Sequence, residues 1–250
     1  EVKSKFNSRH VLLGDINKYE TIRLWFEHDL YDQLQLVQVL AYLGQQGVND
    51  RLRWVLTDRY LGPASESDVH ELFRFDQPVP SGCCELATNV WHTLTHDKPI
   101  SWCGDFSIDL PDWPFLSAAL KRFQAEFPDK TNGLSSTQNL LLGNLTHKNM
   151  RSAALFRACV EQEQSNFLAD AVFMQELIAL VNAKHPLVNI GDSNDVSWES
   201  ECQLTATGRA VIEGKKNHVK LNGIDRWIGG VHLNQNSCWW FNKEVNQLEQ

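Results

Sequence analysis

The chain has 250 residues, of which 42% are apolar and 22% are charged, and its formal net charge is −8. This is the composition of an ordinary globular protein, long enough to bury a core as one large domain or two smaller ones. Intrinsic disorder, collagen and coiled coil are excluded by the same figures. Because the sequence has no run of about 18 apolar residues, it predicts no transmembrane helix.

The negative charge lies mainly in the first half of the chain, where residues 1–114 carry a net charge of −7 and residues 115–250 carry −1. The sequence therefore offers no large basic surface for a nucleic acid, and any phosphate contact has to come from a local patch. A basic strip beside tryptophans would suit single-stranded nucleic acid if the indole rings are exposed, and core packing of those rings is the alternative. The strip consists of Lys215, Lys216, His218 and Lys220, beside Trp227, Trp239 and Trp240.

Two residue types are informative by their numbers. The chain has nine tryptophans, and each buries a large surface and carries one N–H that needs a partner. We therefore expect several small aromatic cores, with a stacking surface as the alternative. The six cysteines form no C-x-x-C motif and no zinc-type spacing with histidine, which is typical of a reduced chain and predicts a cytoplasmic protein.

The first part of the chain alternates strand patterns with helix patterns. We expect Gly44 to end the first helix and Ser65 to cap the second. This alternation predicts an α/β domain over residues 1–112, with a Rossmann-like partial parallel sheet and a boundary near residues 98–114. The expected elements are strands over residues 22–26 and 53–57 and helices over residues 30–44, 65–73 and 83–96.

The second part, residues 113–250, is expected to be α+β. Three helices, a hairpin and a further helix capped by Thr205 form the order of a winged-helix-like domain. A small β-meander is expected to follow, with Asn222 and Gly223 in a hairpin turn. The predicted helices cover residues 114–127, 135–145, 150–163, 169–183 and 204–212, and the predicted strands cover residues 187–190, 202–205, 218–221, 224–233 and 238–241.

The densest group of residues able to do chemistry follows the first strand, where Glu27, His28, Asp29, Asp32 and Gln33 meet the start of a helix. In an open parallel sheet, ligands collect at the carboxyl ends of strands. A carboxylate can orient a neighbouring imidazole as a general base, and Glu, His and Asp together can bind a divalent metal ion. The alternative is structural: Asp29 caps the helix and Asp32 is the acid of its first turn.

A second group lies in residues 222–233, where Asp225, Arg226 and His232 are the polar side chains that could bind a ligand. The Gly229-Gly230 pair within a strand pattern predicts a bulge or a close approach of another backbone, which can make room for a ligand. The alternative is a fixed corner in which the arginine stacks on a tryptophan and pairs with the aspartate.

The third helix of the winged-helix-like part is the one that would enter a DNA groove. Residues 169–178 contain no lysine or arginine, and they include Asp170 and Glu176. Since a helix that binds DNA meets a polyanion with basic or amide side chains, this composition favours contact with a protein.

These motifs resemble a known family. Residues 24–36, with Trp25-Phe26-Glu27-His28-Asp29 at their centre, resemble the signature of the bacterial domain-of-unknown-function 1835 family. The resemblance implies a bacterial protein, adds weight to a functional role for the Glu27-His28-Asp29 motif, and implies no known reaction. It also implies that an N-terminal segment, with part of the sheet and of any site, precedes the residues present. Further similar motifs are Phe127-Pro128, Asn132-Gly133-Leu134-Ser135, Leu204-Thr205 with Gly208-Arg209-Ala210-Val211, and residues 222–233.

We therefore expect a cytoplasmic regulatory or interaction protein that binds a protein partner and no membrane. The alternative is a metal-assisted hydrolase or nucleotide-handling enzyme. It would hold a divalent metal ion at Glu27, His28, Asp29 and Asp32, with ligand contacts from Gln33, Asp225, Arg226 and His232. The enzyme requires His28 and at least two carboxylates to converge on one cavity, whereas the interaction protein requires an exposed apolar or basic-aromatic patch on the third helix or the meander.

Overall fold

A computed structural model describes residue 11 and residues 14–99, 113–163, 167–191 and 195–250. The contacts divide the chain into two units, one of residues 1–27 and 32–91 and the other of residues 28–31 and 92–250. The expected domain limit at residue 112 lies outside the described residues. None of the described helices combines the length and the apolarity needed to cross a lipid bilayer.

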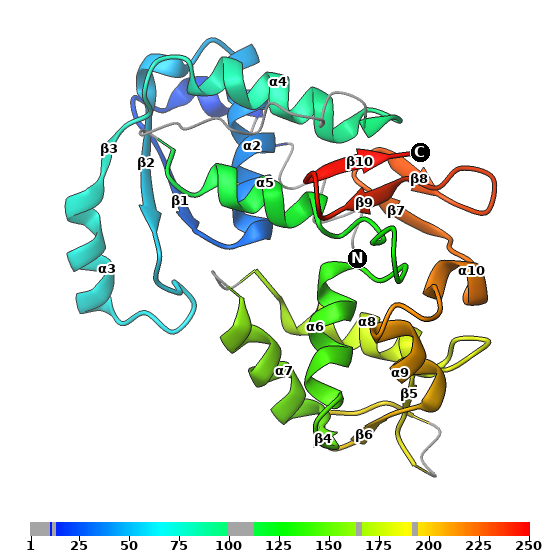
Figure 1. The fold of residues 1–250 in the computed structure, drawn as a ribbon. Coiled ribbons are helices and arrows are strands. Elements are labelled where there is room, and N and C mark those ends of the chain that lie inside the picture. The colour runs from blue at the N-terminus through cyan, green and yellow to red at the C-terminus, as the bar shows by residue number, and fades with distance from the viewer. Residues whose placement is uncertain (1–10, 12–13, 100–112, 164–166, 192–194) are drawn as a thin grey trace. The chain divides into compact units, whose positions relative to one another are not determined.

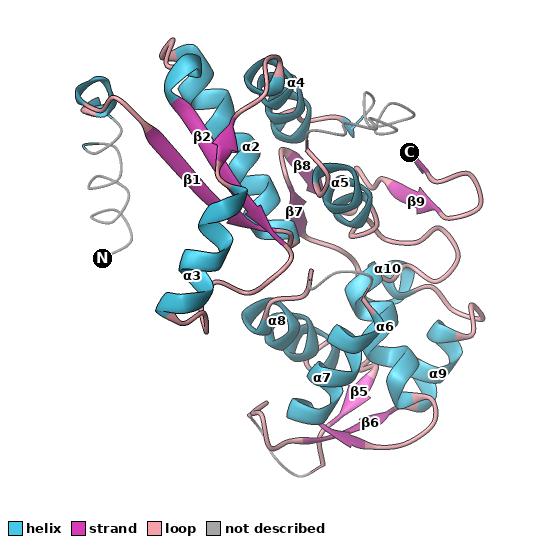
Figure 2. Cartoon of the chain, turned by 90° about the vertical axis from the view of Figure 1, so that its left-hand side faces the viewer, coloured by secondary structure: helices cyan, strands magenta, loops and turns pink. Residues whose placement is uncertain are grey.

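The first unit contains a mixed sheet of three strands in the order β1-β2-β3 (Figure 1), and Figure 2 shows β1 beside β2. Strands β1 (Ile22–Glu27) and β2 (Leu52–Thr57) pair in parallel, from Ile22 opposite Leu52 to Glu27 opposite Thr57. The predicted parallel pair is thus confirmed. Strand β3 (Gln77–Pro78) joins β2 antiparallel, and it was not predicted because two residues carry no periodic signal.

The helices that follow these strands start where the sequence predicts them. Ser65 caps α3 (Glu66–Leu72) in a reciprocal capping box with Asp68. The expected end of α2 at Gly44 is wrong, because this glycine lies within the helix, where a Cβ would come 2.9 Å from Cβ of Cys84. Gly44 therefore permits a close helix contact. The remaining elements around this sheet are α2 (Leu30–Gln45), α4 (Cys83–Thr95) and the short 3-10 helices η1 (Ile16–Lys18), η2 (Asn49–Arg51) and η3 (Phe73–Phe75).

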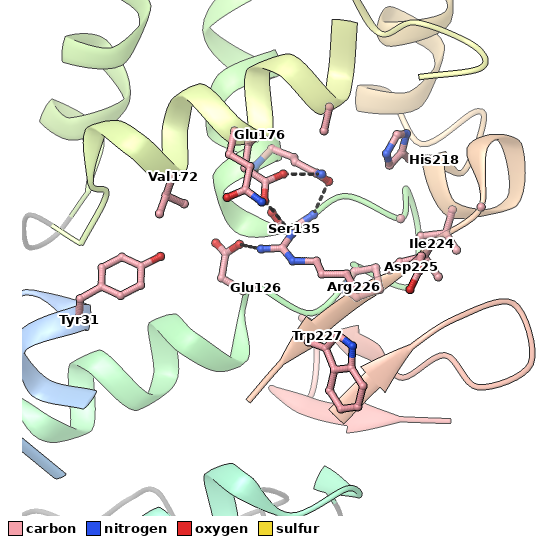
Figure 3. A pocket seen from close by; sticks show the side chains of 17 residues that line it. Tyr31, Glu126, Ser135, Val172, Glu176, His218, Ile224, Asp225, Arg226 and Trp227 are labelled. Carbon is pink, nitrogen blue, oxygen red and sulfur yellow. Dashed lines mark hydrogen bonds and ion pairs between the residues drawn. The ribbon is translucent and has the colours of Figure 1, made fainter. Parts of the chain in front are cut away.

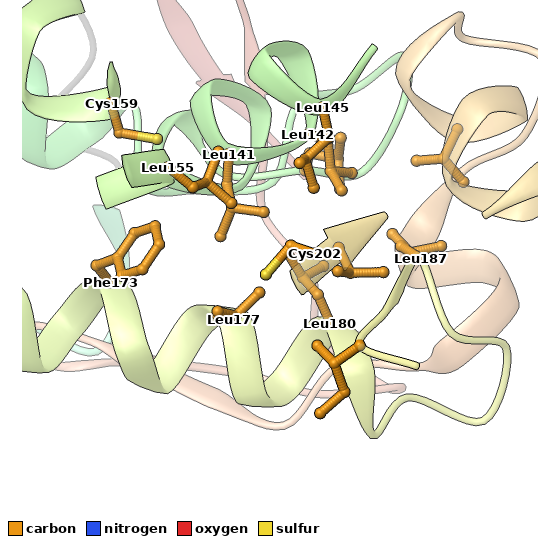
Figure 4. Close-up of a cluster of buried hydrophobic side chains, with 14 of the residues drawn as sticks. Leu141, Leu142, Leu145, Leu155, Cys159, Phe173, Leu177, Leu180, Leu187 and Cys202 are labelled. Carbon is orange, nitrogen blue, oxygen red and sulfur yellow. The ribbon is translucent and has the colours of Figure 1, made fainter. Parts of the chain in front are cut away.

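The second unit is built around a cluster of buried leucines to which helices and a small antiparallel sheet contribute (Figure 4). The sheet has the order β4-β6-β5. Strand β4 (Met150–Arg151) occupies the first two residues of a predicted helix, because pairing with β6 outweighs the local helical pattern. The other elements are α5 (Leu116–Gln124), α6 (Ser136–Leu145), α7 (Ser152–Gln162), α8 (Asp170–Val181), β5 (Val188–Asn189), β6 (Glu201–Leu204) and α9 (Ala206–Ile212).

The end of the chain differs from the predicted meander. Residues His218–Asn222 form helix α10 where a strand was expected, because the Asn217 side chain accepts a bond from the backbone of Lys220 and caps the helix. The predicted hairpin turn at Asn222-Gly223 is therefore wrong, and Gly223, with φ of 78°, ends the helix instead. The hairpins are β7 (Arg226–Ile228) with β8 (Val231–Leu233), and β9 (Trp240–Asn242) with β10 (Gln247–Glu249).

The two glycines between β7 and β8 form a turn and not a bulge within a strand. Gly229 has φ of 57°, and a Cβ on Gly230 would lie 2.1 Å from the carbonyl oxygen of Thr95. The close backbone approach that the sequence predicts is therefore present, and its neighbour is the end of α4.

Two helical glycines test how tightly the second unit is packed. A Cβ on Gly208 would lie 2.2 Å from the carbonyl oxygen of Leu187, whereas a Cβ on Gly143 would meet nothing within 4 Å. We expect Gly208→Ala to lower the free energy of unfolding by about 1–3 kcal/mol through overpacking. Gly143→Ala is expected to raise it by about 0.5–1 kcal/mol, since alanine is the better helix former. Urea unfolding measures both, and equal effects would contradict the packing described.

Candidate functional site

The polar residues at the end of β1 are held by a local hydrogen-bond network. The Glu27 carboxylate accepts a bond from the backbone N–H of Leu61 at 2.7 Å, and its own backbone N–H donates to the Asp32 carboxylate at 2.6 Å. The side-chain amide of Gln33, which is fully buried, donates to the carbonyl oxygen of Glu27 at 2.6 Å. These three side chains thus fasten the strand end to the helix and to a neighbouring loop, which is a structural role.

His28 and Asp29 complete the strand-end motif. The His28 ring is buried, lies 5.8 Å from the Phe115 ring in an edge arrangement, and has no hydrogen-bond partner at Nδ1 within the described part of the chain. Asp29 directly precedes α2, in the position of a helix cap. Among the residues that the structure describes, no group of three or more His, Cys, Asp or Glu is arranged to hold a metal ion. The predicted metal site therefore remains a prediction.

A different part of the molecule contains a pocket of about 500 Å³, which we name the charged pocket (Figure 3). Its walls come from the second unit: from the chain after α5 and from α6, α8, α10 and β7. Tyr31, which belongs to this unit too, also lines the pocket. Helix α8 presents one face to it, since its lining residues recur at the spacing of a single helical stripe. These α8 residues are Val172, Gln175, Glu176 and Ala179.

Arg226 lies at the centre of the charged pocket and pairs with two buried carboxylates. Its Nη2 is 3.1 Å from Oε2 of Glu126, and its Nη1 is 3.0 Å from Oε1 of Glu176. The second oxygen of Glu176 accepts a bond from the Gln138 amide at 2.8 Å. One guanidinium thus joins β7, the end of α5 and α8, and Figure 3 shows these side chains converging from the three segments.

A second arginine supports Glu126 from the other side. Arg122, whose side chain is 9% exposed, pairs with Glu126 and with Glu163, and its distance to Oε1 of Glu163 is 2.6 Å. Thr137 donates to the same Glu126 oxygen from its hydroxyl, at 2.6 Å, and from its backbone N–H, at 3.1 Å. Glu126 is therefore held in place by two guanidinium groups and one threonine.

The two buried glutamates differ in acidity. Burial alone would raise the pKa of Glu126, but Arg122 and Arg226 lower it to about 2. Burial raises the pKa of Glu176 above the ordinary value, although Arg226 opposes the shift, and the charge of Glu126 adds to it. Glu176 therefore carries the less fully compensated negative charge of the two.

His218 faces the pocket from the first turn of α10. Burial lowers the pKa of this histidine to about 4, so its imidazole is neutral at pH 7. Its Nδ1 lies 3.0 Å from the side-chain nitrogen of Asn222. The histidine of the predicted basic strip is thus an uncharged part of a pocket wall.

The second predicted group of site residues, Asp225, Arg226 and His232, does not converge on one point. Asp225 pairs with Nε2 of His232 at 2.7 Å, and the His232 ring stacks on Trp227 with centroids 4.5 Å apart. The expected corner of Arg226 stacked on tryptophan is therefore wrong. Because successive strand residues point to opposite faces, Arg226 turns to the buried carboxylates while Trp227 turns to His232.

The residues that hold Arg226 in place were not identified as site residues from the sequence. Glu126 was not singled out, and Glu176 was considered only as an acidic residue that weighs against DNA binding by its helix. One signal was available: Glu176 lies beside Leu177, within one turn of Phe173 and Leu180, so it borders an apolar stripe. A charge at the edge of a buried helix face needs a partner, although the partner is not readable from local sequence.

Comparison with models of known protein families gives no match for this chain, and comparison with curated protein sequences gives none either. The resemblance to the domain-of-unknown-function 1835 family therefore remains a prediction.

Removing Arg226 tests the charged pocket as a structural unit. We expect Arg226→Met to lower the free energy of unfolding by roughly 3 kcal/mol at pH 7, because it leaves two buried carboxylates short of a cation. Lys130→Met, which removes an exposed ion pair with Glu249, is the control and is expected to cost no more than about 1 kcal/mol. Urea unfolding compares the two, and equal small losses would show that the Arg226 pairs do not organise the pocket.

Proposed function

We propose that this chain is a ligand-responsive regulatory protein. In this proposal the charged pocket binds a small molecule, and a winged-helix-like module bordering the pocket contacts a protein partner. The observation that carries the proposal is the Arg226–Glu176 pair, since Glu176 belongs to α8, the third helix of the proposed module. A ligand that alters this pair acts directly on that helix.

The order of elements in the second unit supports a winged-helix-like module. Three helices are followed by a hairpin, and a further short strand between the first two helices completes an antiparallel sheet in the order β4-β6-β5. In a winged helix the third helix, here α8, is the surface that meets a partner. The mixed sheet of the first unit likewise supports the Rossmann-like interpretation through its parallel pair.

The chemistry of α8 favours a protein partner over DNA. The helix contains no lysine or arginine, its exposed residues include Asp170 and Gln175, and Ile178 is 40% exposed. An apolar side chain on a helix without cations suits a protein surface better than a polyanion. Trp227, which is 65% exposed on β7, is a second apolar group of the kind that an interaction protein requires.

The enzyme alternative has less support. It requires carboxylates free to hold a metal ion or to move a proton, but Glu27 and Asp32 each accept a backbone hydrogen bond. His28, whose buried Nδ1 has no hydrogen-bond partner among the described residues, is the residue through which this alternative is best tested.

A thermal-shift screen distinguishes the two functions. The probes are Mg²⁺, Mn²⁺, AMP, ATP, arginine, putrescine and citrate, and the chains are the unaltered protein, His28→Ala and Trp227→Ala. We expect an organic probe to raise the Tm of the first two chains but not of Trp227→Ala, because Trp227 lines the charged pocket. A probe at 100 times its Kd stabilises the folded state by about 2.7 kcal/mol, a shift of roughly 5–10 °C for a chain of this size.

The same samples test the regulatory part of the proposal. Amide hydrogen exchange in α8 is expected to slow when the stabilising probe is present, since its face lines the pocket. A shift that is caused by a metal ion or a nucleotide, is lost in His28→Ala and is retained in Trp227→Ala would favour the enzyme. A screen in which no organic probe depends on Trp227 would contradict the proposed ligand site.

A further inference from the structure

The charges on the wall of the pocket do not cancel. Its described lining residues include the carboxylates of Glu126, Glu176 and Asp225 and the guanidinium of Arg226, which pairs with the two glutamates, whereas Asp225 pairs with His232. His218 adds no charge at pH 7. Arg122 and Glu163, which continue the network behind the wall, cancel each other. Counted formally, with the histidines neutral, the described lining residues carry two more negative charges than positive ones.

The hydrogen-bonding capacity of the wall is also unbalanced. Both terminal nitrogens of Arg226 donate to carboxylates, and the Gln138 amide donates to Glu176. These donors of Arg226 and Gln138 therefore already have carboxylate acceptors. A carboxylate oxygen can accept two hydrogen bonds, and within the described residues Oε2 of Glu126 receives one, from Arg226. A ligand that supplies donors fits this wall better than one that supplies acceptors.

An anionic ligand would meet a specific obstacle. To reach the guanidinium of Arg226 it would have to displace Glu126, which would lose one of its two arginine partners, or Glu176, which would remain buried without Arg226. Breaking a buried ion pair in this way is strongly unfavourable. A cationic ligand, by contrast, adds to the existing pairs and supplies the missing positive charge.

Aromatic rings at the pocket favour the same kind of ligand. Trp227, which lines the edge of the pocket, is 65% exposed although one face of its ring stacks on His232, and Tyr31 lies on the side of Glu126 away from Trp227 (Figure 3). A cation is attracted to the face of an indole or phenol ring. Carboxylates with exposed rings nearby form a common environment for organic ammonium and guanidinium groups.

We infer that the charged pocket binds a small organic cation, a molecule carrying a protonated amine or a guanidinium group. This inference rests on the proposed ligand site and names the ligand class of that site. In this inference the ligand's N–H groups donate to the carboxylate oxygens of Glu126 and Glu176, and the exposed Asp225 adds a negative charge at the mouth.

Three four-carbon probes that differ mainly in charge test this inference: putrescine (+2), 1,4-butanediol (0) and succinate (−2). Isothermal titration of the full chain is expected to detect putrescine and neither of the others. Glu176→Gln and Asp225→Asn, which each remove one negative charge, are expected to weaken putrescine binding roughly tenfold, a loss of about 1.4 kcal/mol. Lys215→Gln, at an exposed residue paired with Glu213 outside the pocket, is the control and is expected to change nothing.

Each outcome decides between the inference and the function on which it rests. Asp225 is exposed, so Asp225→Asn reports on binding even if Glu176→Gln fails to fold. If succinate or butanediol binds in a manner lost in Trp227→Ala and putrescine does not bind, the cation inference is overturned while the ligand site stands. Saturation by Mg²⁺ alone, or putrescine binding that neither charge variant weakens, also overturns it. If no probe depends on Trp227, both proposals fail.

Discussion

The ion pairs of Arg226 with Glu126 and Glu176 are the interaction on which the pocket depends. Each glutamate is buried, and a buried charge is tolerated where it is paired and hydrogen-bonded. The two glutamates come from different segments, one after α5 and one in α8. Arg226 therefore joins both segments to the β7–β8 hairpin. The pocket is the space that remains between these three segments and α10.

The same constraint gives the pocket its chemical character. Burial would raise the pKa of Glu126, but Arg122 and Arg226 together lower it to about 2, whereas burial raises the pKa of Glu176 although Arg226 opposes the shift. The charge of Glu126 is therefore more fully compensated than the charge of Glu176 on α8. A cation entering the pocket would complete the charge balance at the helix that, in the winged-helix-like interpretation, meets the partner. The proposed ligand response follows from this asymmetry.

The sequence predicts those parts of the fold that have local signals. Helices with a side-chain cap at Ser65, Ser135 and Thr205 begin where expected, and the parallel strands follow from their apolar runs. The two-residue strands β3 and β4 and helix α10 escaped prediction, because pairing partners and a single cap decide them. The site was predictable in part: Arg226 was identified as a binding residue, but its carboxylates lie 100 and 50 positions away in the chain. Only the fold brings such residues together.

The most direct test of the central claim is a carboxyl-carbon NMR titration of the full chain, with Glu126 and Glu176 assigned by single substitutions to Gln. The account predicts that Glu126 titrates with a pKa of about 2 and Glu176 above the ordinary glutamate value. Putrescine is expected to lower the pKa of Glu176, since a nearby cation favours the charged form. Two glutamates that titrate together in the ordinary range, with or without putrescine, would contradict the account.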